Sequence, residues 1–242
     1  MFSGLLSEIA KNGSFVLVVI LVAAVIIALA KVSEVTFLKG SVHDVGSTKY
    51  ITICGMFGAL AAVLMYFEFP IPFLAPPFYK LDFSELPVMI GGMYLGPAAA
   101  VIIEFVKILL KLVLKGTTTA FVGDFANFAV GCSLVLPAVI VYHTGKTKGR
   151  ALAGLITGTI VLTAFGTLFN ALYLLPAFSK LYGMPMDVLI EMGTAVNAKI
   201  TNITSFVMLA VAPLNLIKGL SISILTMLLY KHISRMLHGM MN

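Results

Sequence analysis

The chain is poor in charge, in cysteine and in catalytic motifs. Only 11% of its 242 residues are charged, against about 25% in soluble domains, which excludes a soluble globular protein. The two cysteines, Cys54 and Cys132, lie inside apolar runs without metal-ligand spacing, so they are expected to be small core residues without a redox role. Neither an HExxH nor a GxSxG motif occurs. The whole chain is 60% hydrophobic with a mean hydropathy of +1.07, the composition of an integral membrane protein.

Apolar runs long enough to cross a hydrocarbon core of about 30 Å predict transmembrane helices. The clearest runs cover residues 15–30, 51–66, 121–141, 151–175 and 203–230. The apolar region 86–114 is interrupted at Gly96-Pro97, which predicts two shorter helices, 86–96 and 97–114, joined by a tight turn. The expected fold is therefore an all-α integral membrane protein, with a core of six transmembrane helices and one additional N-terminal transmembrane helix. Its expected parts are that helix at 1–31, a cytoplasmic linker at 32–48 and the six-helix membrane domain at 49–242.

The basic residues predict how the chain crosses the cell membrane. They gather in three segments that the positive-inside rule places in the cytoplasm: Lys31, Lys39 and Lys49; Lys146, Lys148 and Arg150; Lys231 and Arg235. The proline-rich loop 67–85, the turn 112–120 and the connection 176–205 then face outside, and the C-terminus is cytoplasmic. The net charge of +6 follows from this bias and requires no nucleic-acid partner.

The first apolar run ends in Ala28, Leu29 and Ala30, which resembles a signal-peptidase site. Cleavage there would place Lys31 and the linker outside, against the charge bias. The segment before residue 15 also lacks a basic region, since Lys11 is its one basic residue. A retained helix is therefore favoured over a cleaved signal peptide.

The loop 67–85 is polar, aromatic and broken by prolines. Pro70, Pro72, Pro76 and Pro77 remove backbone donors and bias their neighbours to extended conformations, so the preceding helix cannot continue. Because this loop lies between two long apolar runs, we interpret it as a lid at the membrane surface. The alternative is an interfacial re-entrant turn that binds no ligand.

Three polar side chains within apolar runs indicate where a ligand binds. Lys218 stands where a charge costs roughly 2.5–3.5 kcal/mol on insertion scales, so it should face a cavity or a polar partner. Asn215 lies three residues earlier on the same helix face, and Asn170 is a second amide near the outer half of its helix. Two carboxamides and an ammonium offer donors and acceptors to a polyol chain or a carbonyl-rich ring. Hydrogen bonding between helices is the alternative for each amide.

A row of lysines follows one face of the predicted helix 97–114. Lys107, Lys111 and Lys115 recur every four residues, and Glu104 precedes Lys107 by three and is a candidate partner for it. Snorkelling towards the interface explains Lys111 and Lys115. Attraction of an anionic ligand is the competing interpretation, and Lys107 remains open between a structural and a substrate-binding role.

Small residues on the first core helix predict close helix contacts. Gly55 and Ala59 form one small-xxx-small pair, and Gly58 and Ala62 form another. Such pairs let a second helix approach closely, whether it belongs to this chain or to a partner.

The chain resembles the substrate-binding subunits of energy-coupling-factor (ECF) vitamin importers, of the riboflavin-specific type. The resemblance covers most of residues 51–230 and rests on GMFGALAAVLMYFEFPIPFLAPPF, KLDFSELPVMIGGMYLGP, IEFVKILL, GTTTAFVGDFANFAVG, LFNALYLLP and PLNLIKG. It implies a six-helix subunit that binds riboflavin with high affinity under a gating loop and translocates it without chemistry of its own. It also implies a membrane coupling protein and two ABC-type ATPases as partners, and no cofactor besides the transported flavin.

The resemblance also implies roles for particular residues. Asn170, Asn215 and Lys218 match the flavin-binding residues, while Leu81, Asp82 and Phe83 match the gating-loop contacts. Gly55 and Ala59 occupy the small-residue pattern that contacts the coupling protein. The extra N-terminal helix and the long connection 176–205 depart from the family pattern.

The sequence leaves alternatives open for the ligand and for the class of protein. The ligand is riboflavin or an anionic flavin such as FMN, which a basic row facing outside would suit. In the other alternative the chain is a membrane enzyme for a lipid or isoprenoid substrate, with Asp82, Glu85 and Asp124 as its polar centre. These carboxylates lack the clustering that would hold Mg²⁺ against a pyrophosphate, so the chain is not expected to be an enzyme.

Overall fold

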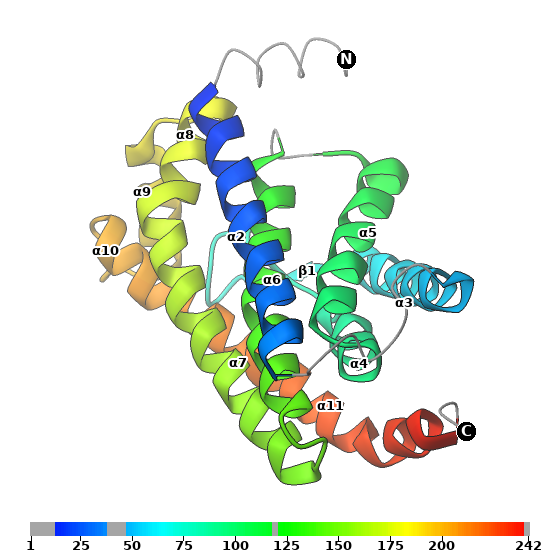
Figure 1. Ribbon diagram of the computed structural model, residues 1–242. Helices are drawn as coiled ribbons and strands as arrows, with labels where there is room; N and C mark the ends of the chain where they lie inside the picture. The colour runs from blue at the N-terminus through cyan, green and yellow to red at the C-terminus, as the bar shows by residue number, and fades with distance from the viewer. Residues whose placement is uncertain (1–12, 38–46, 118–120, 240–242) are drawn as a thin grey trace.

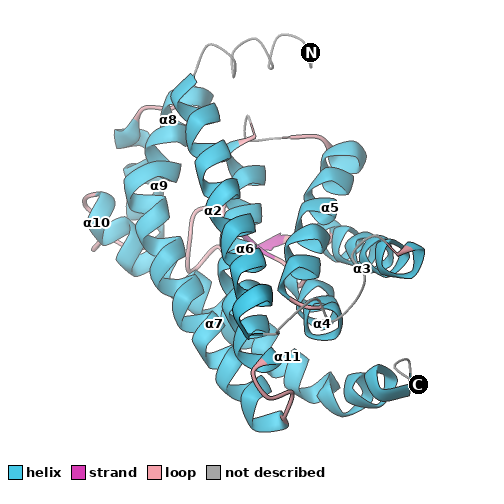
Figure 2. Cartoon of the chain, in the orientation of Figure 1, coloured by secondary structure: helices cyan, strands magenta, loops and turns pink. Residues whose placement is uncertain are grey.

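The computed structural model describes residues 13–37, 47–117 and 121–239, which fold almost entirely into helices (Figure 2). In chain order the elements are α2 (Gly13–Phe37), α3 (Thr48–Tyr66), β1 (Phe69–Pro70), β2 (Lys80–Leu81), α4 (Glu85–Leu95), α5 (Pro97–Lys115), α6 (Val122–His143), α7 (Lys148–Phe169), η1 (Asn170–Leu174), α8 (Leu175–Tyr182), α9 (Met186–Val196), α10 (Ile203–Phe206), η2 (Val207–Val211) and α11 (Ala212–Gly239). Both η elements are π-helical turns within longer helices.

The long helices pack side by side into a bundle. The most extensive pair is α6 with α7, and α7 also packs along α11 while α3 packs along α5. Figure 1 shows the α6–α7 turn at one end of the bundle, with α8 and the start of α2 at the opposite end. The basic turn at Lys146 and Lys148 is therefore separated from α8 by the length of α7.

Within the described residues, five helical segments are long and apolar enough to cross a membrane: Gly13–Thr36, Thr48–Tyr66, Val122–His143, Lys148–Leu181 and Ile203–Tyr230. These segments confirm the all-α membrane fold. The 11 residues of α4 rise only about 16 Å at 1.5 Å per residue, too little to span the hydrocarbon core alone. Both cysteines are buried, as expected of small core residues.

The predicted break at Gly96-Pro97 is confirmed. Gly96 has φ 113° and joins α4 to α5, where Pro97 occupies the first turn. A side chain with a Cβ would be strained at this φ, whereas glycine adopts it readily. The carboxylate of Glu34 accepts a 2.9 Å hydrogen bond from the Ala98 amide, which places a negative charge at the start of α5.

The N-terminal helix and the connection 176–205 are more helical than expected. The helix α2, which carries Glu34, continues to Phe37. Residues 32–37 are therefore helical, although they were expected to belong to the linker. Residues 38–46 of that linker lie outside the described part. The helix expected to stop at 175 continues through Pro176 to Tyr182 as α8. The short helices α9 and α10 fill most of the remaining connection.

Prolines mark both π-helical turns. The turn η1 ends with a bond from the Leu175 amide to the Asn170 carbonyl, five residues back. Pro176 follows directly, and Pro213 stands just after η2; neither has an N–H to offer the preceding turn. π-helical turns are frequent at functional sites, and η1 begins at one of the predicted ligand-binding amides.

Candidate functional site

The segment between α3 and α4 forms a lid over the bundle. Its strands pair antiparallel, Phe69 with Leu81 and Pro70 with Lys80. Phe78 stacks on Phe178 of α8, with ring centroids 5.5 Å apart and an interplanar angle of 20°. Extended, proline-rich backbone and aromatic packing thus hold the lid against α8.

A cavity of about 140 Å³ lies beneath this lid. Its walls come from the lid, α6, η1, α8 and α11, and its polar lining consists of Tyr79, Lys80, Asn127, Asn170, Asn215 and Lys218. Pockets for small organic ligands are usually about 300–1,000 Å³. The cavity is smaller than this range, so a ligand of that size requires part of the wall, of which the lid is one side, to move.

Asn170 joins the lid to the helices. Its Nδ2 donates a 2.7 Å hydrogen bond to the Gly166 carbonyl, and its Oδ1 accepts one of 2.7 Å from the Tyr79 hydroxyl. The amide orientation is fixed by these two partners. Burial raises the pKa of Tyr79, so the hydroxyl stays protonated and acts as the donor.

Asn215 and Lys218 lie on one face of α11, as their spacing predicted. Both are more than nine-tenths buried. The Nδ2 of Asn215 has no hydrogen-bond partner among the described residues. A buried donor without a partner costs about 1–3 kcal/mol, so a ligand acceptor in the cavity would remove that cost.

Lys218 belongs to a network of five buried charges. Its Nζ lies 3.3 Å from Asp82 Oδ2 and 3.0 Å from Glu85 Oε1. The same Glu85 oxygen lies 3.2 Å from Lys107 Nζ, which is 2.5 Å from Glu104 Oε1. Two ammonium groups thus face three carboxylates between the lid and the bundle.

Asp82 connects the lid to this network. Burial alone would raise the pKa of Asp82, but the Lys218 and Lys107 ammonium groups and a 2.8 Å bond from the Ser84 amide outweigh it. The result is a pKa of about 2. The carboxylate remains charged at neutral pH and holds the end of the lid against α11.

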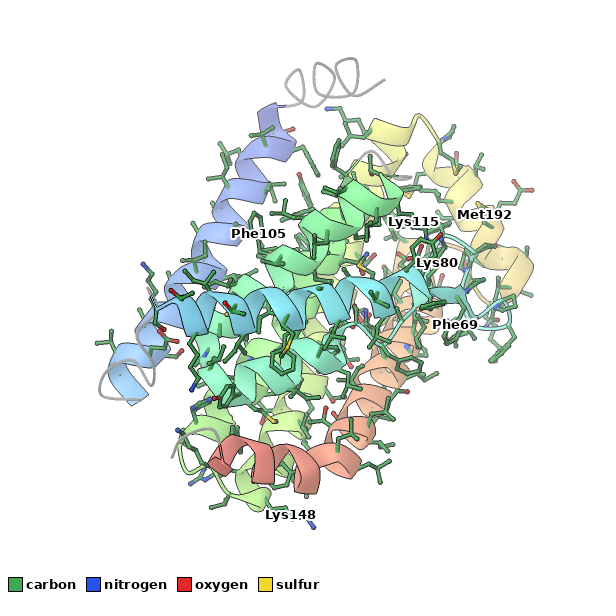
Figure 3. The ribbon with its side chains drawn as sticks, turned by 90° about the vertical axis from the view of Figure 1, so that its right-hand side faces the viewer. Phe69, Lys80, Phe105, Lys115, Lys148 and Met192 are labelled. Carbon is green, nitrogen blue, oxygen red and sulfur yellow. The ribbon has the colours of Figure 1, made fainter. Side chains whose placement is uncertain are left out.

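A second group of charges, Glu68 with two lysines, fixes the other end of the lid. Glu68 Oε1 lies 2.9 Å from Lys80 Nζ and 2.5 Å from Lys115 Nζ. Figure 3 shows Lys80 and Lys115 on the same side of the molecule, close to Phe69. Burial would raise the pKa of Glu68, but the bonds from Lys115 and Lys80 lower it overall.

The residues predicted for the site fall into two groups. Asn170, Asn215, Lys218 and Leu81 line the cavity. Those outside its lining are Asp82, Phe83 and Lys107: Asp82 and Lys107 belong to the charge network, and Phe83 packs against Phe69 and the core.

Three polar residues of the lining were not predicted as site residues: Tyr79, Lys80 and Asn127. Asn127 carried the same signal as Asn170, an amide inside an apolar helix, and its Nδ2 donates to the Gly123 carbonyl at 3.0 Å. Tyr79 gave no comparable signal, because its partner Asn170 is 91 residues away in the sequence.

The lysine row on α5 is not an unpaired basic surface. Lys107 pairs with Glu85 and Glu104. Lys111 pairs with Asp124, and Lys115 pairs with Glu68. The pairing of Lys107 with Glu104 is confirmed. The row offers no ammonium without a carboxylate partner to attract an anion.

The two pairs of small residues on α3 face different surroundings. A Cβ on Gly58 would lie 2.5 Å from Val106 Cγ1, so Gly58 allows α5 to approach closely. A Cβ on Gly55 would meet nothing within 4 Å, and Ala59 is exposed. Gly55 and Ala59 therefore leave a flat surface on the outside of α3.

The carboxylates considered for an enzyme are all paired with lysines. Asp82 and Glu85 contact Lys218, and Asp124 contacts Lys111. No group of three potential metal ligands occurs among the described residues.

Fold and site together define a helical membrane protein with a polar cavity under a lid, the architecture of a substrate-binding transport subunit. A family model for the substrate-specific component of ECF transporters matches residues 49–230, and the chain belongs to this family. It is a transporter subunit and not an enzyme.

Relatives agree with this assignment. The chain is 36% identical over 189 residues to the riboflavin transporter RibU of Staphylococcus aureus strain TCH60, covering 78% of this chain and 92% of the relative. It is 30% identical to the riboflavin transporter FmnP of Bacillus subtilis strain 168, over 75% of this chain and 90% of the relative. A solved S component of a bacterial ECF transporter matches with a TM-score of 0.62 and 35% identity, covering 78% of this chain and 97% of that one.

Proposed function

We propose that the chain binds riboflavin in the cavity under the lid and imports it as the substrate-binding subunit of an ATP-driven ECF transporter. The observation that carries the proposal is the convergence of Asn170, Asn215 and Lys218 on this cavity, together with relatives named as riboflavin transporters. The resemblance supplies the expected partners, a membrane coupling protein and two ABC-type ATPases. The C-terminus is expected in the cytoplasm.

The polar lining suits a neutral ligand with many carbonyl and hydroxyl groups. Lys218 has three N–H donors, two of which face Asp82 and Glu85, so one is left for a carbonyl oxygen. Asn215 Nδ2 supplies a second unused donor. Asn127 adds a further amide for the polyol chain or the ring.

The charges favour riboflavin over FMN. The network beside the cavity has two ammonium groups and three carboxylates, so it offers no excess positive charge to a phosphate. The lysines of α5 are likewise paired. A phosphate at these lysines would lie close to the carboxylates that already neutralise them, and a buried charge without a partner of its own is costly.

Competition between the two flavins tests the proposal. Purified protein should be yellow with a flavin absorption spectrum, and the extracted pigment should be riboflavin. Added riboflavin should displace a fluorescent flavin at much lower concentration than FMN. Colourless protein that quenches neither flavin would contradict the proposed ligand, and equal competition by FMN would contradict the charge argument.

A further inference from the structure

A second cavity lies between α2, α5 and α6, away from the lid. Its volume is about 560 Å³. Figure 1 shows α2 lying across α6 with α5 beside it, and Figure 3 shows Phe105 on the side of α5 turned towards α2. The family match begins at residue 49, so α2 and the wall that it contributes lie outside the matched region.

The helix α2 contacts the bundle at both ends of this cavity. At one end Phe15 packs edge-on against Phe125, with centroids 6.0 Å apart. At the other end Glu34 accepts the hydrogen bond from the Ala98 amide. Between these contacts α2 presents Ala23 to the cavity, and this small side chain leaves the space unfilled.

The lining and length of this cavity fit a hydrocarbon chain. Apart from Lys31, Glu34 and Asp124, every side chain in its wall is apolar. The α5 wall runs from Ala98 to Leu112, a rise of roughly 21 Å at 1.5 Å per residue. One leaflet of the hydrocarbon core is about 15 Å thick, so a single acyl chain fits within the groove.

An empty groove of this size would forfeit many packing contacts, because protein interiors are close-packed. Lipid surrounds the outer faces of a membrane helix, so lipid acyl chains are the apolar groups available to fill the space. The groove is therefore better packed with an acyl chain in it than without one.

Lys31 gives the groove a charged end. It is exposed, lines the cavity and has no salt-bridge partner among the described residues. The neighbouring carboxylate of Glu34 accepts from the Ala98 amide, and the positive end of the α5 helix dipole offsets part of its charge. An ammonium without a carboxylate partner among the described residues, at the edge of an apolar groove, complements an anionic headgroup, because basic side chains near a membrane surface attract anionic lipids.

We propose that the groove between α2, α5 and α6 is a binding site for one anionic phospholipid, with an acyl chain along α5 and its phosphate at Lys31. The bound lipid fills the gap between α2 and the bundle. This proposal is independent of the flavin site.

Native mass spectrometry of the full chain tests the site, after exchange from vesicles containing equal amounts of phosphatidylglycerol and phosphatidylcholine. We expect the wild type to retain one phosphatidylglycerol in preference to phosphatidylcholine. Ala23→Phe fills the groove, so the amount of phosphatidylglycerol that it retains should be at least ten-fold lower than in the wild type. Ala24→Phe, the same change one residue along on the exposed face, should retain it.

A charge variant tests the headgroup assignment. Lys31→Glu should abolish the preference for phosphatidylglycerol, whereas Lys148→Glu, an equal charge change at the α6–α7 turn, should keep it. Circular dichroism shows whether each variant keeps its helical content. If Ala23→Phe does not fold, Ala23→Leu takes its place as the groove-filling variant. Retention by the groove-filling variant, equal retention of both lipids by the wild type, or an unchanged preference in Lys31→Glu would overturn the proposal.

Discussion

The hydroxyl of Tyr79 in the lid donates a 2.7 Å hydrogen bond to Oδ1 of Asn170 in the cavity wall. This bond occupies an acceptor of a predicted ligand-binding amide and also fastens the lid. Opening the lid and freeing Asn170 are therefore one event. A ligand that binds Asn170 Oδ1 must compete with Tyr79 for it.

Tyr79→Phe should accelerate entry of riboflavin. The variant keeps the ring but loses a hydrogen bond worth about 0.5–1.5 kcal/mol, so the closed lid is less stable. We expect the association rate, measured by stopped-flow quenching of flavin fluorescence, to rise by up to about ten-fold. Tyr66→Phe, at an exposed tyrosine at the end of α3, serves as the control. An association rate in Tyr79→Phe that matches this control would show that the bond does not limit opening.

Lys107→Met should destabilise the fold far more than Lys80→Met. Lys107 is fully buried between two carboxylates, and removing one partner of a buried pair costs about 3–5 kcal/mol. Lys80 forms a partly exposed pair, worth about 0–1 kcal/mol. Thermal unfolding in detergent measures both. Similar melting temperatures for the two variants would contradict the central place of Lys107 in the charge network.

Acid should release the lid over a defined range. The pKa of Asp82 is lowered from its usual value of 3.8 to about 2, so its contribution to stability is present above pH 3.8 and is lost as the pH falls towards 2. The melting temperature of the wild type should exceed that of Asp82→Asn above this range, and the difference should shrink within it. A difference that persists unchanged at pH 2 would contradict the ion pair with Lys218.

Gly55→Leu and Ala59→Leu should separate binding from transport. The space outside both residues is free in the isolated subunit, so riboflavin affinity should remain nearly unchanged. Uptake into vesicles that contain the expected coupling protein and ATPases should be abolished, because a large side chain holds a partner helix away. Gly58→Leu is the contrasting variant: it collides with Val106 and should lower the melting temperature. Normal uptake by both surface variants would remove this face from the coupling interface.

Much of the fold could be predicted because its signals are local. Apolar length predicted the long helices, and the Gly96-Pro97 pair predicted the α4–α5 turn. The spacing of Asn215 and Lys218 predicted their common face. The helix α9 was missed because its 11 residues fall below the length of a membrane span.

The contacts that assemble the site join distant parts of the sequence. Lys111 and Lys115 suggested a basic surface only because their partners, Asp124 and Glu68, lie on α6 and on the lid. The spacing of lysines along one helix carries no information about carboxylates brought to it by other elements. The contact between Tyr79 and Asn170 was unpredictable from spacing for the same reason.

The central claim is that the cavity under the lid binds riboflavin, and equilibrium titration by flavin fluorescence quenching tests it most directly. Asn215→Ala and Lys218→Ala should each weaken binding by about 1–3 kcal/mol, or roughly five- to 150-fold. Asn197→Ala, which changes an amide outside the cavity lining, should bind as the wild type does. Unchanged affinity in both cavity variants, with melting temperatures showing that they are folded, would contradict the account.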